Sequence, residues 1–244
     1  MEKGSEIRSA IEELSMVVKV KTGEDHDAAV HVPHDTAHIP TGPFLSVCNS
    51  IRLVLDKIGP TMAVLRQDVH QNIQRLEMAH ESNPSKYSNF VEMLKKEVNE
   101  GNARKGASCC KAFVWLTRSM DFMAALLQRL AKDPRQSMEQ AVEESYSIAL
   151  KPWHGWISSA AFKVALKLVP DDKTFITLLL AKDENLDTLQ EEMQALTSLL
   201  VPFLEEIHSI LVSLHSCCLT TCLTWYITHL FLLLSNSAGI IRLG

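Results

Sequence analysis

A polar helix face is the first feature of this sequence that could do chemistry. In RQDVHQNIQRLE, residues 66–77, the side chains of Asp68, Asn72 and Arg75 follow one another at spacings of four and three. On an α-helix such positions share one face, and the apolar residues of the segment share the next one. A carboxylate, an amide and a guanidinium together can accept and donate several hydrogen bonds. Most polar helix faces only meet water, so the pattern alone leaves a solvated face and a ligand site both open.

A second segment repeats this spacing around an indole. Within residues 108–130, Lys111, Trp115 and Arg118 again follow one another at four and three residues, beside an apolar stripe. Tryptophan in such a place is most often a half-buried core residue. An indole can also stack on the apolar C–H face of a sugar ring, while Asp and Asn side chains bond the sugar hydroxyls. Both interpretations of Trp115 remain open at this point.

The segment WHGW, residues 153–156, brings two indoles and an imidazole into four positions. Pro152 and Gly155 favour a helix boundary or a kink here. His154 taken alone fits a hydrogen-bonded core histidine as well as a ligand contact. An exposed Trp156 would suit membrane docking, because tryptophan prefers the interface between bilayer and water.

The elements that must position these residues are helices. The 244 residues are 46% hydrophobic, enough for one sizeable core with flanking segments. Apolar residues recur mostly at helical spacing, and strand-like alternation is scarce, so the fold class is all-α. We expect helices near residues 5–21, 43–58, 60–80, 85–100, 106–131, 137–151, 155–168, 172–180 and 187–212.

Signatures of enzymes and of nucleic-acid binding are missing from the sequence. It contains no Walker loop, GxSxG elbow, HExxH motif or dinucleotide fingerprint. A net charge of −5 with interspersed signs gives no reason to expect nucleic acid. We therefore expect no catalytic residue, no cofactor and no nucleic-acid partner, and a binding function rather than an enzyme.

The cysteines and the N-terminus favour a reduced, cytoplasmic environment. The six cysteines have neither the pattern of a disulfide framework nor the spacing of a zinc site. The opening MEKGSEIRSAIEEL lacks the apolar region of a secretory signal. We expect no metal site and a cytoplasmic protein.

Two stretches do not follow the helical pattern. Residues 23–44 are polar, are punctuated by proline and carry four histidines, which favours a flexible loop over a metal site of fixed geometry. Residues 210–236 contain no Asp, Glu, Lys or Arg, and the stretch 217–234 is long enough to cross a bilayer. Four threonines and a histidine make it a poor span. Aberrant or alternative coding, a tail anchor and a buried helix all remain open for it.

The three motifs together resemble the glycolipid transfer protein family. DVHQNIQR (68–75), WLTR (115–118) and WHGW (153–156) follow one another in the family's order and with its intervening lengths. Any one of them alone would be a weak signal, whereas three in order are a strong one. The resemblance implies a two-layer, all-α sandwich enclosing an apolar pocket for lipid chains.

This resemblance divides the chain into three parts. Residues 1–42 would form an N-terminal helix and a flexible loop with histidines and prolines. Residues 43–211 would form the glycolipid transfer protein domain. Residues 212–244 would be a hydrophobic, uncharged tail, which departs from the mixed polar and apolar ending of the family.

The resemblance also implies a role for each site residue. Asp68 and Asn72 would bind the sugar headgroup, and Asp68 would also accept the amide N–H of ceramide. Arg75 would donate to sugar oxygens, and Trp115 would be the platform on which the first sugar stacks. His154 would donate to the ceramide amide carbonyl, which requires a protonated ring nitrogen.

Lys111 and Trp156 extend this site in two directions. Relatives that carry ceramide-1-phosphate have a lysine at the position of Asn72 and arginines at the positions of Lys111 and Trp115. Cations suit a phosphate, whereas Asn72 and Trp115 suit an uncharged sugar, so a glycolipid is favoured. Lys111 remains a possible headgroup contact, and Trp156 would dip into the membrane interface.

The expected function is therefore transport without covalent chemistry. The protein would carry a glycosphingolipid of the galactosyl- or glucosylceramide type between membranes and contact the membrane surface transiently. Transfer of ceramide-1-phosphate is the first alternative, because Lys111 could meet a phosphate. A lipid-sensing or tail-anchored adaptor that binds lipid but does not shuttle it is the second.

Overall fold

The computed structural model describes residues 6–23, 38–58, 62–133, 136–180 and 185–214. Within these ranges the chain is helical, and the single β-bridge joins Pro40 to Asn89, so the all-α prediction is confirmed. The helices are α1 (Glu6–Gly23), α2 (Thr41–Ile58), α3 (Ala63–Ser82), α4 (Phe90–Asn99), α5 (Cys109–Lys132), α6 (Met138–Ala149), η2 (Lys151–Trp153), α7 (Trp156–Leu166), α8 (Asp172–Leu179) and α9 (Leu186–Ser213).

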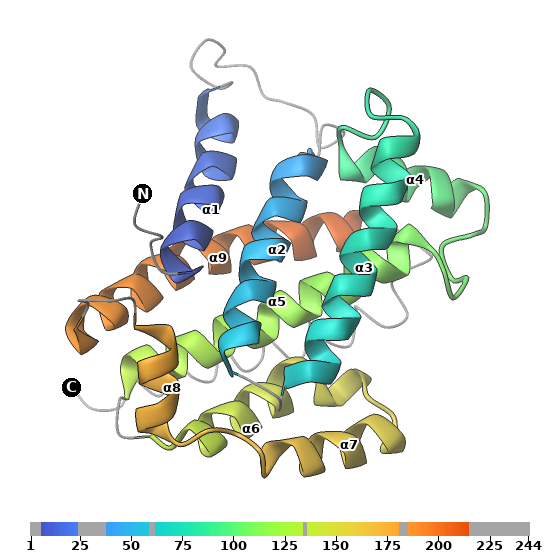
Figure 1. Ribbon diagram of the computed structural model, residues 1–244. Coiled ribbons are helices and arrows are strands. Elements are labelled where there is room, and N and C mark those ends of the chain that lie inside the picture. Colours follow the sequence, from blue (N-terminus) through green and yellow to red (C-terminus); the bar gives the residue numbers. More distant parts are fainter. Residues whose placement is uncertain (1–5, 24–37, 59–61, 134–135, 181–184, 215–244) are drawn as a thin grey trace, which may run out of the picture.

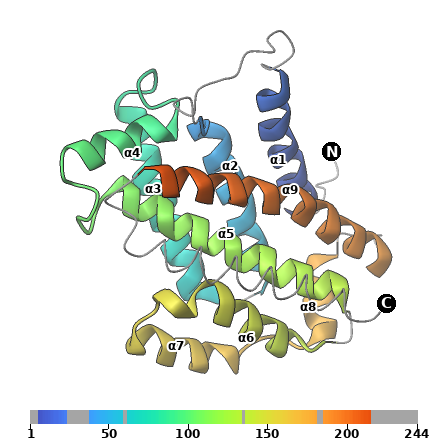
Figure 2. The ribbon, with the colours of Figure 1, turned by 180° about the vertical axis from the view of Figure 1, so that it is seen from behind.

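The helices form two layers (Figures 1 and 2). Helices α1, α2 and α3 lie side by side in one layer, and α5 lies between α9 and α6 in the other. The long α5 crosses beneath α3 and α2, while α9 crosses beneath α1. α7 and α8 lie at the end of the molecule where α6 is found. Because α3 lies against α5, and α5 against α6, the three helices that carry or precede the sequence motifs are neighbours.

Aromatic side chains fill the space between the layers. The ring of Phe44 on α2 lies 5.0 Å from that of Phe90 on α4 and 4.9 Å from that of Phe113 on α5. Phe203 on α9 completes the group, 6.3 Å from Phe44. All four rings are buried. Such rings bury large apolar areas, so they join both layers at one end of the core.

Helix α1 is part of this core. Its side chains Ile7 and Leu14 are fully buried, and α1 packs against α2 and α9. At its start, Arg8 Nε donates to Glu192 Oε1 on α9 at 2.8 Å. The division of the chain at residues 42 and 211 remains a prediction, but α1 shares one core with the helices that follow it.

The side chains of one serine and one glutamate fix the start of α5. The hydroxyl of Ser108 accepts the N–H of Lys111 at 3.1 Å. The carboxylate of Glu97 accepts the N–H groups of Cys109 and Cys110, both at 2.8 Å. These bonds satisfy N–H groups that have no partner within the helix, and the negative charge suits its positive end. Lys111 and the residues after it therefore enter the fold at a fixed register.

The predicted helix over 85–100 is shorter than expected. It begins at Phe90, because the Asn89 side chain caps it by accepting the N–H of Val91 at 3.1 Å. The same oxygen accepts the N–H of Ile39 at 3.0 Å, so it also fixes the entry to α2. Residues that bond their side chains to nearby backbone favour caps over helix interiors.

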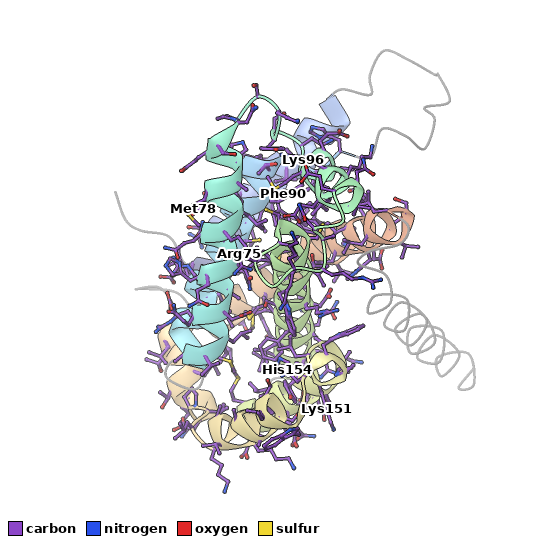
Figure 3. The ribbon with its side chains drawn as sticks, turned by 90° about the vertical axis from the view of Figure 1, so that its right-hand side faces the viewer. Arg75, Met78, Phe90, Lys96, Lys151 and His154 are labelled. Atoms are coloured by element: carbon purple, nitrogen blue, oxygen red, sulfur yellow. The ribbon has the colours of Figure 1, made fainter. Side chains whose placement is uncertain are left out.

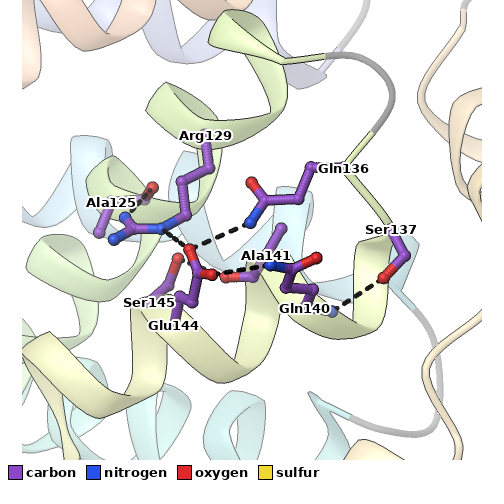
Figure 4. A network of polar contacts seen from close by, with 8 residues as sticks. All are labelled: Ala125, Arg129, Gln136, Ser137, Gln140, Ala141, Glu144 and Ser145. Carbon is purple, nitrogen blue, oxygen red and sulfur yellow. Dashed lines mark hydrogen bonds and ion pairs between the residues drawn. The ribbon is translucent and has the colours of Figure 1, made fainter.

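A polar network ties α6 to α5 (Figure 4). Glu144 accepts hydrogen bonds from Arg129 on α5 at 3.1 Å, from Gln136 at 3.0 Å and from Gln140 at 3.0 Å. These three donors lower the pKa of the Glu144 carboxyl below its ordinary value. α6 thereby keeps a fixed orientation on α5, and the segment that follows α6 inherits it.

One helix in the described ranges, α9, is long and apolar enough to cross a membrane by length and composition. It also packs against α5 and α1, and core helices of globular proteins satisfy the same criterion. The predicted tail at 217–234, and His26, His31 and His34 of the predicted loop, lie outside the described residues.

Candidate functional site

The polar face predicted on α3 forms a bonded row. Asn72 Nδ2 donates to Asp68 Oδ2 at 3.0 Å, and a longer contact of 3.5 Å joins Arg75 Nη1 to Asn72 Oδ1. Asn72 is only 5% exposed and Arg75 is half-buried, whereas Asp68 meets solvent although neighbouring groups cover part of its carboxyl. The amide of Asn72 thus holds the carboxylate in place, while Asp68 keeps acceptor capacity for another donor.

Opposing effects act on the pKa of Asp68. Partial burial raises the pKa of its carboxyl, while Arg75, the hydrogen bond from Asn72 and the ammonium of Lys111 act to lower it. The net direction is upward, because the loss of water outweighs the nearby cations. A ligand N–H or O–H that bonds the carboxylate would replace part of the lost hydration. Lys111 is exposed on α5 and faces the same region.

Trp115 and His154 form the second half of the site. Their ring centroids lie 5.8 Å apart with an angle of 32° between the planes, although the residues are far apart in sequence. Both side chains are half-buried. Trp115 comes from the first half of α5, and His154 follows η2, which contains Pro152 and turns the chain away from α6. The predicted boundary at Pro152 and Gly155 is confirmed, because Gly155 caps α7.

His154 is held by a tyrosine. Its Nδ1 lies 3.2 Å from the hydroxyl of Tyr146 on α6, which is itself 3.3 Å from the Ser159 hydroxyl on α7. The Tyr146 ring stacks on Phe162 of α7 with centroids 3.5 Å apart. Burial, and secondarily the positive charge of Arg118, lower the pKa of His154. The ring is therefore neutral near pH 7 and carries one N–H.

Helix α7 presents apolar side chains to solvent. Trp156 is 82% exposed and Ile157 is 64% exposed, and Val164 one turn from the helix end is exposed as well. Lys163 and Lys167 are exposed on the same helix and just after it. Trp156 follows His154 by two residues, so this apolar surface begins directly at the edge of the site. Figure 3 shows His154 and Arg75 on the same side of the molecule, with α5 between them.

Residues 39–181, more than half of the chain, match the family model described as glycolipid transfer protein (GLTP). The chain belongs to this family. It is 57% identical over 211 residues to glycolipid transfer protein 3 of Arabidopsis thaliana, covering 86% of this chain and 89% of that protein. Glycolipid transfer protein 2 of the same plant is 54% identical over 209 residues, covering 86% of this chain and 90% of that protein.

Solved structures agree with this membership. A structure concerned with how FAPP2 selects simple glycosphingolipids using the GLTP fold matches with a TM-score of 0.67 and 28% identity, covering 74% of this chain and 87% of that one. A variant of Arabidopsis ACD11 complexed with C12 ceramide-1-phosphate matches with a TM-score of 0.74. Its identity is 16%, with 88% of this chain and 98% of that chain covered, and this likeness concerns the fold. The predicted glycolipid transfer protein fold is confirmed.

Three residues around the glycolipid transfer protein motifs were given no role from the sequence. Tyr146 and Ser159 were not predicted, because they meet His154 only after η2 reverses the chain. Arg118 was part of a quoted motif but received no role. Its guanidinium carbon lies 4.8 Å from the Trp115 ring centroid. A cation one turn from a predicted platform was the available signal for it.

The apolar core near α8 leaves little free space. A cavity near α8, lined by Leu130, Met138, Phe175 and Leu189 among others, has a volume of about 30 Å³. That is room for about one water molecule and far less than a hydrocarbon chain needs. Among the described residues, no group of three His, Cys, Asp or Glu side chains is arranged to hold a metal ion.

Proposed function

We propose that this protein is a non-enzymatic carrier that takes a glycosphingolipid from one membrane and delivers it to another. The observation that supports this most is the packing of α3 against α5, which puts the Asp68–Asn72 pair and the Trp115–His154 pair on neighbouring helices. The two closely similar Arabidopsis proteins are named as glycolipid transfer proteins. The proposed place of action is the cytoplasmic face of membranes, in transient contact with them.

The headgroup would be recognised by a ring surface and a row of hydrogen bonds. The indole of Trp115 offers a half-exposed apolar face to the C–H side of the first sugar. Asp68 and Asn72 provide acceptors and donors for its hydroxyls. When the Tyr146 hydroxyl donates to Nδ1, a neutral His154 carries its one N–H on Nε2, and this group can donate to the ceramide amide carbonyl. Each role needs no bond to be made or broken, so the proposed function involves no catalytic residue.

The lipid chains would enter the interior only after it opens. Each methylene group moved out of water gains about 0.8 kcal/mol, which favours any apolar space over the aqueous phase. The rings of Phe44 and Phe113 pack between the layers, and the cavity near α8 is too small for a lipid chain. Packed cores resist partial insertion, so neighbouring helices or side chains must separate during uptake. The headgroup would then remain on the polar face while the chains lie between the layers.

The exposed apolar surface of α7 would be the membrane contact. Trp156 and Ile157 can insert into the interface, and Lys163 and Lys167 can lie near the lipid phosphates. This surface adjoins His154, so docking would bring the site to the bilayer surface.

Replacement of Trp156 and Ile157 by serine should weaken vesicle binding by about tenfold or more, because burial of each such side chain is worth roughly 1.5–3 kcal/mol. Binding would be measured by co-sedimentation with phosphatidylcholine vesicles that contain glucosylceramide. Met78→Ser on α3 is the matched control, because Met78 is an apolar side chain of similar exposure, 65%, outside α7. Equal partition of the double variant, the control and the unchanged protein would contradict this docking surface.

Ceramide-1-phosphate is the second candidate ligand, because Lys111 places an exposed cation near Asp68. The two ligands can be separated in vesicle transfer assays with fluorescent glucosylceramide and ceramide-1-phosphate of equal chain length. We expect faster transfer of glucosylceramide, because Asp68 repels a phosphate and Asn72 supplies no charge. Faster transfer of the phosphate lipid would contradict the proposed cargo. Retention of the protein in membranes after alkaline extraction would instead favour a tail-anchored adaptor.

A further inference from the structure

A buried arginine lies behind the Trp115 indole. Arg118 is 7% exposed, and its guanidinium carbon lies 3.8 Å from the ring centroid of Trp153 and 4.8 Å from that of Trp115. Trp115 and Arg118 share a face of α5, whereas Trp153 comes from η2 after the chain has left α6. The guanidinium therefore joins α5 to the segment that carries His154.

Acidic and basic groups from two helices surround the far side of this arginine. Arg118, Asp121, Trp153 and His208 line a common cavity of about 10 Å³. Asp121 Oδ1 lies 3.0 Å from His208 Nε2 on α9, so this contact joins the carboxylate on α5 to the neighbouring helix. A buried cation is costly unless opposite charge or a ring face compensates it. Arg118 has the ring faces of Trp115 and Trp153, and it lines the same cavity as the carboxylate of Asp121.

We propose that Arg118 is a positioning residue of the headgroup site, whose planar cation between the indoles of Trp115 and Trp153 sets the orientation of the Trp115 platform. The proposal rests on the carrier function proposed above. It assigns Arg118 no contact with the lipid, because the side chain lies beneath the indole and is almost fully buried.

The planar shape of the guanidinium is central to this role. A guanidinium can lie flat against two ring faces, whereas a lysine ammonium is a compact point charge. A platform whose orientation is fixed before the sugar arrives loses less conformational entropy on binding. A fixed indole also fixes the distance of 5.8 Å between the rings of Trp115 and His154. The sugar and the ceramide amide would then be bound at a constant separation.

The charge of Arg118 has a second, measurable consequence at His154. Its Coulombic effect lowers the pKa of His154 in addition to the effect of burial. Removal of the charge should therefore raise this pKa, although burial would still hold it below the ordinary value. A residue that only filled space beside the two indoles would not produce this change.

The experiment compares Arg118→Lys and Arg118→Met, after circular dichroism has shown that each variant is folded. The first readout is the rate of glucosylceramide transfer between phosphatidylcholine vesicles, and the second is the NMR titration of His154. We expect both variants to lose about tenfold in transfer rate, because neither retains the planar contact. Arg118→Lys should leave the pKa of His154 near that of the unchanged protein, and Arg118→Met should raise it. Arg52→Lys on α2 is the matched control and should alter neither readout, because Arg52 pairs with Asp56 on its own helix, outside the site.

The outcomes separate this inference from the proposed function. Wild-type transfer of both Arg118 variants would overturn it, and so would full activity of Arg118→Lys alone, since charge without a plane would then suffice. A His154 titration that is unchanged in Arg118→Met would overturn it as well. If the unchanged protein carries no glucosylceramide, the carrier function fails, while the NMR signals of the Trp115 indole and of His154 still test whether Arg118 positions both rings.

Discussion

Trp115→Ala should lower glucosylceramide transfer by about thirtyfold or more. The half-exposed indole is the only large ring surface beside Asp68 and Asn72 among the residues proposed for the headgroup. Truncation of a central aromatic contact costs about 2 kcal/mol or more, and each 1.4 kcal/mol is a factor of ten in affinity. The rate of transfer between vesicles of phosphatidylcholine measures the loss.

Trp115→Phe is the matched variant, because it retains a ring for stacking and loses only part of the indole surface. It should keep a larger share of the transfer rate than Trp115→Ala. Circular dichroism and the melting temperature would identify a loss of fold, since Trp115 is partly buried against Arg118. Normal transfer by a folded Trp115→Ala protein would contradict the assignment of Trp115 as the sugar platform.

Local patterns predicted the helices and the two faces because neighbouring residues determine both. The spacing of Asp68, Asn72 and Arg75 was sufficient to place them on one face of α3, where they are now joined by hydrogen bonds or close contact. Pro152 and Gly155 marked the break between α6 and α7 for the same reason. The residues proposed for ligand binding were named by resemblance to a family, and their roles stay predictions.

Contacts between distant segments were beyond such patterns. The bond of Tyr146 to His154 depends on how η2 reverses the chain, and the place of Arg118 between two indoles depends on the packing of α5 against that turn. The small size of the cavity near α8 was likewise unpredictable, because apolar composition is the same for a filled core and an empty pocket. All of these features arise from tertiary packing, and the geometry of the proposed site depends on them.

Asp68→Val should abolish most glycolipid binding and leave the fold intact. The variant removes an acceptor that is expected to meet both a sugar hydroxyl and the ceramide amide, and a hydrogen bond to a charged group is worth about 1.5–3 kcal/mol. A loss of about a hundredfold or more in affinity follows for two such bonds. The variant removes a carboxylate whose charge partial burial disfavours, but it also removes the acceptor of the buried Asn72 amide, so circular dichroism and the melting temperature are measured with binding.

Asp68→Asn separates the shape of this side chain from its charge. In the unchanged protein, affinity for glucosylceramide should fall as the pH is lowered through the raised pKa of Asp68, because protonation removes the acceptor charge. The Asn variant has no such carboxyl at this position, so its weaker binding should lose that step in the pH profile. Binding to vesicles of fixed composition, measured at several pH values, gives both profiles. If the two profiles keep the same acidic step, or if Asp68→Val binds normally, another group must hold the headgroup and the proposed role of Asp68 is wrong.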